Sequence, residues 1–235
     1  MNRQAQAVIL LLFGGAIVKA GVTDLSLRYV KEGLRPFLVA AGLVLVAAAV
    51  ATLWYELRRP ATDDDSHHHH HEPRVGWLLI LPVLGLLLVA PPALGSYAAE
   101  RSGSVLTAQT DSDYPPLPPG DPAPVSLLDY ASRAVFDEGK SLGGRTLRLV
   151  GFVTPGADGQ PMLTRMVLSC CAADGRPIKV GLTGDTPAGL PPDSWVRVDG
   201  VYTARTGTDE INQAKVPYLD VKSWEQVPAP RNEYE

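Results

Sequence analysis

Apolar residues are concentrated in the first hundred positions of this 235-residue chain. Residues 37–55 and 75–94 carry no charged side chain, and each is about as long as the ~20 residues that cross a hydrocarbon core of ~30 Å. Trp54 and Tyr55 end the first run and Trp77 lies near the start of the second, positions typical of membrane interfaces. The pattern predicts a transmembrane helix in each run.

Residues 5–22 form a third apolar run, which Lys19 interrupts. One interpretation is a signal peptide cleaved near Gly21. The other is a membrane helix in which the Lys19 side chain reaches the headgroups. Gly14 and Gly15 favour the helix, because small residues let membrane helices approach closely. We therefore predict three spans.

The predicted membrane domain covers residues 1–98, and its three spans put its two ends on opposite sides of the bilayer. Basic residues near the spans are divided almost evenly between the two sides, so the positive-inside rule favours neither orientation strongly. Arg58 and Arg59 directly follow the span at 37–55 and favour a cytoplasmic loop between the second and third spans. We expect a multi-pass protein of the cell membrane with its C-terminal domain outside the cytoplasm.

The loop between the second and third spans, residues 60–74, contains all the histidines of the chain. They are His67, His68, His69, His70 and His71. Three aspartates precede this run and Glu72 follows it. Neutral imidazoles bind zinc, copper and nickel, and nearby carboxylates attract divalent cations. The loop is a candidate metal site, although an engineered tag or a polar loop whose metal affinity is unused would show the same residues.

A proline-rich segment, residues 99–124, separates the membrane domain from the rest of the chain. Six prolines fall within residues 114–124, and such a run favours an extended polyproline conformation. The segment could serve as a ligand for a proline-reading domain, but we expect a stalk that holds the next domain away from the bilayer.

Residues 125–235 have the pattern of a soluble domain in which one helix is followed by β structure. Residues 126–136 have apolar positions at helical spacing, and Ser126 is the expected N-cap. Short strand-like segments then follow one another, separated by Gly, Pro, Asp or Asn. These segments are 145–154, 162–171, 177–183, 194–204 and 218–226. Five short strands predict a small all-β, OB-like barrel, with its helix before the first strand, whereas the usual OB helix lies between the third and fourth.

Several functional classes lack their sequence signatures. Residues 125–235 contain twelve Lys and Arg against fourteen Asp and Glu, so this domain has no basic surface for nucleic acid. The same residues contain no histidine, which excludes a Cys–His catalytic pair within the domain. No glycine-rich phosphate loop follows a strand. We therefore do not expect an enzyme.

The only cysteines of the chain, Cys170 and Cys171, are adjacent. On a regular strand their side chains would point to opposite faces. If the strand ends earlier, both thiols can turn toward one ligand together with Asp174, and thiolates hold zinc or copper. Inert packing and a vicinal disulfide are the alternatives. Arg165 could contact an anionic ligand, although a strand arginine is more often part of a solvated or salt-bridged face.

The cysteine segment resembles the R-x-x-x-x-C-C-x-A-D signature of an uncharacterised (YcgQ-like) bacterial membrane-protein family. The matching residues are Arg165, Cys170, Cys171, Ala173 and Asp174. Residues 144–153 and 194–200 resemble two strand motifs of the same family, so the resemblance covers nearly the whole chain. It implies N-terminal membrane helices, a C-terminal β domain and a many-helix permease encoded nearby. It implies no reaction, because none is established for the family.

From these features we predict a membrane-anchored accessory or binding subunit of a transport system, with a role in handling a divalent metal. Zinc is the first candidate for this metal. The partners of this subunit would be the lipid bilayer and a membrane permease. The alternative is a membrane-tethered thiol-redox protein that uses Cys170 and Cys171. Under the predicted topology, the histidine loop and a site made of Cys170, Cys171 and Asp174 lie on opposite sides of the membrane and are separate.

Overall fold

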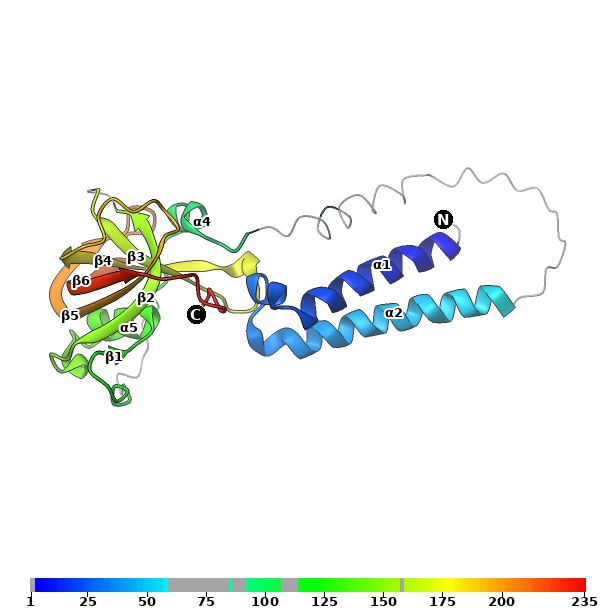
Figure 1. Ribbon diagram of the computed structural model, residues 1–235, viewed down its shortest axis with the longest axis horizontal. Coiled ribbons are helices and arrows are strands. Elements are labelled where there is room, and N and C mark those ends of the chain that lie inside the picture. Colours follow the sequence, from blue (N-terminus) through cyan, green and yellow to red (C-terminus); the bar gives the residue numbers. More distant parts are fainter. Residues whose placement is uncertain (1–2, 59–84, 86–91, 107–113, 157–158) are drawn as a thin grey trace. The chain divides into compact units, whose positions relative to one another are not determined.

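The computed structural model describes residues 3–58, 85, 92–106, 114–156 and 159–235. The chain forms two compact units, Met1–Pro92 and Ala93–Glu235. The first contains helices and the second is dominated by a β-sheet, as Figure 1 shows.

In its described residues the first unit contains two long helices joined by two short 3-10 turns. The elements are α1 (Arg3–Val22), η1 (Asp24–Arg28), η2 (Glu32–Leu34) and α2 (Arg35–Arg58). Both helices are apolar around their whole circumference, which is typical of helices surrounded by lipid or by other apolar helices. They pack against each other as a helical hairpin (Figure 1).

Glycine permits the close approach of α1 and α2. A Cβ atom added at Gly14 would lie 3.0 Å from the carbonyl oxygen of Gly42, and one added at Gly42 would lie 3.1 Å from that of Gly14. The predicted role of Gly14 in helix packing agrees with this geometry, whereas Gly15 has no neighbour within 4 Å of the Cβ position. Arg35 closes the hairpin, because its guanidinium donates to the last carbonyls of α1, at Gly21 (2.7 Å) and Val22 (3.0 Å).

Among the described residues one helix, Glu32–Arg58, is long and apolar enough to cross a membrane, and Gln6–Val22 is a shorter apolar helix. These correspond to the predicted spans at 37–55 and 5–22. The predicted span at 75–94 lies outside the described residues apart from Gly85 and 92–94, and the histidine loop at 60–74 lies wholly outside them. The first unit therefore shows one or two helices of membrane-like length where three spans are predicted.

The part of the second unit that the structure describes contains two α-helices, two 3-10 turns and six strands. They are α4 (Ser96–Glu100), β1 (Ala123–Pro124), α5 (Leu127–Phe136), η4 (Lys140–Leu142), β2 (Leu147–Pro155), β3 (Pro161–Val167), η5 (Ala172–Asp174), β4 (Arg176–Gly184), β5 (Trp195–Thr208) and β6 (Lys215–Gln226).

Strands β2 to β6 form a closed five-stranded barrel. Neighbouring strands pair in the order β2-β3-β4-β6-β5, and β5 returns to pair with β2. Within the barrel all pairs are antiparallel except β4 with β6, which is parallel. The short β1 adds to β2 in parallel. Closure leaves no free edge among these five strands. The predicted OB-like barrel with a preceding helix fits this domain.

Helix α5 packs its buried face into the core of the barrel domain, and side-chain oxygens cap its start. Ser126 accepts the backbone N–H of Asp129 at 3.0 Å, as its predicted N-cap role requires. Leu127, Tyr130 and Ala131 are fully buried among the barrel strands. The Tyr130 hydroxyl donates to the Tyr218 carbonyl oxygen at 2.5 Å, so this buried polar group is satisfied.

The segment predicted as a stalk packs on the barrel in its described parts. Ser104 is buried, and Val105 donates its backbone N–H to the Pro177 carbonyl at 2.8 Å. Further along, Ala123 is fully buried and pairs with Leu147 of β2. The compact barrel unit begins at Ala93, and the predicted boundaries at 99 and 125 stay predictions. Proline content predicted an extended backbone and gave no information on what that backbone contacts.

Strand β3 ends before the two cysteines, whereas the predicted strand included them. The expected strand 162–171 ends as β3 at Val167. The backbone N–H groups of Ser169 and Cys170 are bound by the Asp174 side chain and are therefore not available for pairing with β4.

Candidate functional site

The two cysteines lie in a tight loop between β3 and β4. Leu168, the first residue after β3, is buried in a small cluster with Met166 and Trp195, and this anchors the start of the loop. Cys170 is exposed and Cys171 half-buried. The short helix η5 begins directly after Cys171 and returns the chain to β4.

Asp174 holds the loop in its conformation. Its two carboxylate oxygens accept the backbone N–H groups of Ser169 at 3.0 Å and Cys170 at 2.8 Å. Its own N–H donates to the Cys171 carbonyl at 3.0 Å. The next residue, Gly175, has no room for a larger side chain, because a Cβ atom there would lie 2.5 Å from Leu94 Cδ1 and 3.2 Å from Leu168 Cδ2.

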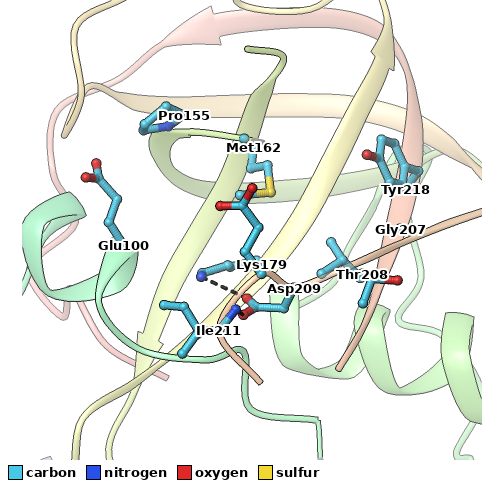
Figure 2. Close-up of a pocket in the computed structure, with 12 residues that line it drawn as sticks. Glu100, Pro155, Met162, Lys179, Gly207, Thr208, Asp209, Ile211 and Tyr218 are labelled. Atoms are coloured by element: carbon cyan, nitrogen blue, oxygen red, sulfur yellow. Dashed lines mark hydrogen bonds and ion pairs between the residues drawn. The ribbon is translucent and has the colours of Figure 1, made fainter. Parts of the chain in front are cut away.

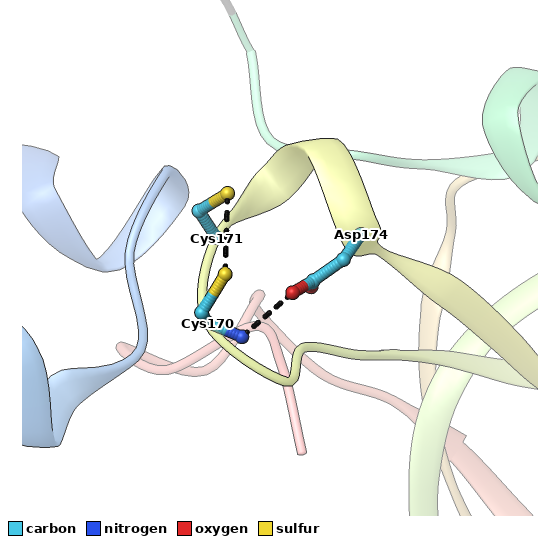
Figure 3. Close-up of side chains that lie close together, drawn as sticks. All are labelled: Cys170, Cys171 and Asp174. Carbon is cyan, nitrogen blue, oxygen red and sulfur yellow. Dashed lines mark hydrogen bonds between the residues drawn. The ribbon is translucent and has the colours of Figure 1, made fainter.

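This loop brings both thiols and one carboxylate together. The Sγ atoms of Cys170 and Cys171 are 3.6 Å apart, and one ligand atom from each of Cys170, Cys171 and Asp174 lies within 4.8 Å of the others. Figure 3 shows the two sulfurs side by side and the Asp174 carboxylate facing the Cys170 backbone nitrogen. It is the only such group of metal-binding side chains found in the described part of the chain. The strand ends before the doublet, so the two side chains do not take opposite faces.

The acid–base properties of the loop follow from these contacts. Hydrogen bonding to Asp174, and then to Cys171, raises the pKa of the Cys170 thiol to about 11, because both favour its protonated form. The same bond from Cys170 lowers the pKa of Asp174. At neutral pH Cys170 is therefore a thiol beside a carboxylate, and a metal would have to displace its proton.

Arg165 binds the C-terminal segment of the chain. Its guanidinium donates to the carbonyl oxygens of Asn232 (2.7 Å) and Tyr234 (3.3 Å), and its Nε lies 3.8 Å from the Glu235 carboxylate. Burial lowers the pKa of Arg165, opposed by the charge of Glu235. The described contacts of Arg165 are internal, and its predicted contact with a ligand stays a prediction.

The C-terminal residues in turn fix the start of the cysteine loop. The Leu168 N–H donates to the Glu235 carbonyl at 3.1 Å, and the Glu235 N–H donates to the Met166 carbonyl at 2.9 Å. The Tyr234 hydroxyl accepts the N–H of Leu94 at 2.8 Å. Composition gave no signal for this arrangement, because the interacting residues are distant in sequence.

A buried ion pair in the barrel was also missed by sequence reasoning. Lys179 Nζ lies 2.8 Å from Asp209 Oδ2, and both side chains are buried. Lys179 stands between Ile178 and Val180 in a strand-like run. The signal that could have pointed to it is a lysine between two apolar residues within a short strand.

Fold and site together define a class of protein: a helical unit with a helix of membrane-spanning length, followed by an OB-like barrel that displays a Cys-Cys-Asp loop. Residues 133–235 match the family model described as the DUF1980 C-terminal domain. The match runs from within α5 to the end of the chain and includes the loop, which supports the expected resemblance to an uncharacterised family over the barrel domain. Comparisons with curated proteins and with solved structures gave no match.

Proposed function

We propose that the chain is a membrane-anchored binding subunit of a transport system and that its barrel domain binds a divalent metal ion. Zinc is the first candidate. The convergence of the two thiols and Asp174 within 4.8 Å is the observation that carries this proposal. Two sulfurs and one carboxylate oxygen are ligand types that zinc accepts. They leave a tetrahedral ion one ligand short, so an exchangeable water or a group from a partner would complete the site.

The ligands are held largely in place before metal arrives. Asp174 already fixes the backbone of Ser169 and Cys170, and the loop is anchored by Leu168 and Gly175. Little chain entropy remains to be lost on binding, which favours affinity. The exposure of Cys170 gives the ion access from solvent.

The rival function is thiol-redox chemistry at the same loop. The 3.6 Å separation of the sulfur atoms favours it, since a disulfide needs only a further approach of the two sulfurs. Both functions need a thiolate, so the raised pKa of Cys170 does not separate them. The Asp174 carboxylate does, because it adds a third metal ligand within 4.8 Å and has no part in a disulfide. Metal binding is therefore the proposal that this geometry supports better.

The membrane part of the proposal rests on the apolar helix Glu32–Arg58. We further propose that the partner is a membrane permease and that the barrel lies outside the cytoplasm. Co-purification of a many-helix membrane protein with the tagged full chain would support the partner. Recovery of the chain alone under mild detergent would count against it.

A zinc titration tests the metal site. The full chain in detergent, with His67–His71 replaced by serine, is titrated against a chromophoric zinc chelator with its thiols kept reduced. We expect one tight site per chain that disappears in the Cys170→Ser, Cys171→Ser double variant. Asp174→Asn should weaken it, while Asp185→Asn, the same change at an exposed aspartate outside the loop, should not. Absence of binding by the reduced parent chain would refute the proposal.

A further inference from the structure

A second site of different chemistry lies near the opposite end of β3 from the cysteine loop. A cavity of about 390 Å³ opens where the β2–β3 turn and the β5–β6 loop meet the outer surface of β3 and β4. Its volume is in the range of ligand-binding pockets. OB-folds bind extended ligands on this face of the barrel.

The walls of this cavity combine apolar and acidic groups. Pro155, Met162 and Ile211 supply apolar surface, and Ile211 is exposed at the tip of its loop. Glu100 on α4 and Glu210 on the β5–β6 loop add two exposed carboxylates. Figure 2 shows Glu100 and Ile211 on the side of the cavity opposite Tyr218.

Lys179 is the one cationic side chain among the described residues that line the cavity, and it is paired with an aspartate. Its Nζ donates to Asp209 Oδ2 at 2.8 Å and to the Ser102 carbonyl at 3.0 Å. Within the described residues, these acceptors account for two of the three hydrogens of the buried ammonium group, so one hydrogen is left for an acceptor in the cavity. With Lys179 and Asp209 paired, the net charge of the lining comes from Glu100 and Glu210 and is negative.

These observations together specify a ligand with two features. It carries a cation on an apolar stem, for the carboxylates and the apolar wall, and it carries a hydrogen-bond acceptor, for Lys179. A bare metal ion does not fit, because among the described residues metal-binding side chains converge only in the cysteine loop. A lysine or arginine residue within an extended peptide has both features, in its side chain and its backbone carbonyl.

We propose that this cavity binds a basic residue of an extended peptide segment from a partner protein. Glu100 and Glu210 receive the ammonium or guanidinium group, and Lys179 donates to a peptide carbonyl. This site is independent of the metal site, and either can exist without the other.

Binding of a labelled probe peptide, acetyl-Gly-Gly-Lys-Gly-Gly-amide, to the full chain in detergent tests the proposal. We expect saturable binding that weakens with added salt and is about tenfold weaker in the Glu100→Gln, Glu210→Gln double variant, since each exposed charge pair contributes modestly. Glu138→Gln removes an exposed carboxylate that does not line the cavity and should leave affinity unchanged.

Two further probes separate the parts of the proposal. The same peptide with norleucine in place of lysine lacks the cation and should bind at least tenfold more weakly. Cadaverine has the cation and stem without the acceptor, so binding as tight as that of the lysine peptide would overturn the peptide assignment. No saturable binding of the lysine peptide, or equal binding by the double variant with its thermal unfolding unchanged, would overturn the site itself.

Discussion

At the scale of single residues, Asp174 determines the state of the cysteine loop. It fixes the backbone at Ser169 and Cys170, and hydrogen bonding to it keeps the Cys170 thiol protonated. The sequence allowed either a regular strand through the doublet or an earlier end with both thiols turned to Asp174. It could not decide between them, because the decision depends on which backbone N–H groups the Asp174 side chain captures.

Replacing Asp174 with Asn should lower the pKa of Cys170 from about 11 toward the usual thiol value near 9. The carboxylate stabilises the protonated thiol, and asparagine removes both its charge and its strongest acceptor. Thiolate absorbance against pH, measured in a Cys171→Ser background with and without Asp174→Asn, reports the Cys170 titration alone. Coincident curves would show that Asp174 does not control this thiol.

At the scale of elements, the Lys179–Asp209 pair joins three parts of the barrel domain. Asp209 also accepts the backbone N–H groups of Ser104 (3.2 Å) and Ile211 (2.9 Å), so it ties β4 to the β5–β6 loop and to the segment after α4. Burial raises the pKa of Asp209, but the hydrogen bonds from Lys179 and from backbone N–H groups outweigh this and lower it overall.

Lys179→Met should cost about 3 kcal/mol of unfolding free energy, because it leaves a buried carboxylate without its cation. The lowered pKa of Asp209 means that its stabilisation is fully present above the unfolded pKa near 4 and is lost as pH falls through the folded pKa. Denaturant unfolding from pH 7 to pH 2 should show a larger loss below pH 4 in the parent than in Asp209→Asn. Equal acid sensitivity would contradict this account.

The start of α5 depends on a residue at the far end of the chain. Glu235 accepts the N–H groups of Leu127 at 3.0 Å and Leu128 at 2.9 Å, and Ser126 accepts the next available one. The helix and its Ser126 cap could be predicted because both are local in sequence. The Glu235 contribution could not, because it depends on where the folded C-terminal segment lies.

Glu235→Ala should destabilise the chain by about 2 kcal/mol, since it removes the acceptors of two helix N–H groups and the ionic partner of Arg165. Glu233→Ala is the matched control, because it removes a glutamate from the same segment and leaves the Glu235 carboxylate that accepts the two helix N–H groups. Chemical denaturation of both variants gives the comparison. A loss of equal size in both would show that the capping contacts are not what stabilises this segment.

At the scale of the whole molecule, the sequence predicts the order of the helical unit and the barrel, but it does not predict which residues contact each other. Apolar runs and alternating strands predicted a helical unit followed by a small barrel, and strand pairing confirmed the barrel. Within the predicted spacer 99–124, the described residues Ser104 and Ala123 are buried in the barrel unit, and the spacer role itself stays a prediction. Burial of small side chains depends on tertiary contacts that a proline-rich composition does not encode.

The predicted orientation places the barrel outside the cytoplasm, and the exposed Cys170 makes this testable. A membrane-impermeant maleimide should label the chain in intact spheroplasts, because Cys170 would face the medium. The printed sequence has two cysteines, Cys170 and Cys171, so the label reports on the cysteine loop. The Cys170→Ser, Cys171→Ser variant is the control for background. Labelling only after the membrane is permeabilised would reverse the orientation.

The central claim, that Cys170, Cys171 and Asp174 form a metal site, is tested most directly by cobalt absorption spectroscopy. Cobalt(II) occupies zinc-type sites and gives a thiolate charge-transfer band that reports sulfur coordination. In the full chain with His67–His71 replaced by serine, we predict a saturable band at one equivalent, reduced in either single Cys→Ser variant and absent in the double variant. A reduced chain that shows no thiolate band at any cobalt concentration would contradict the account.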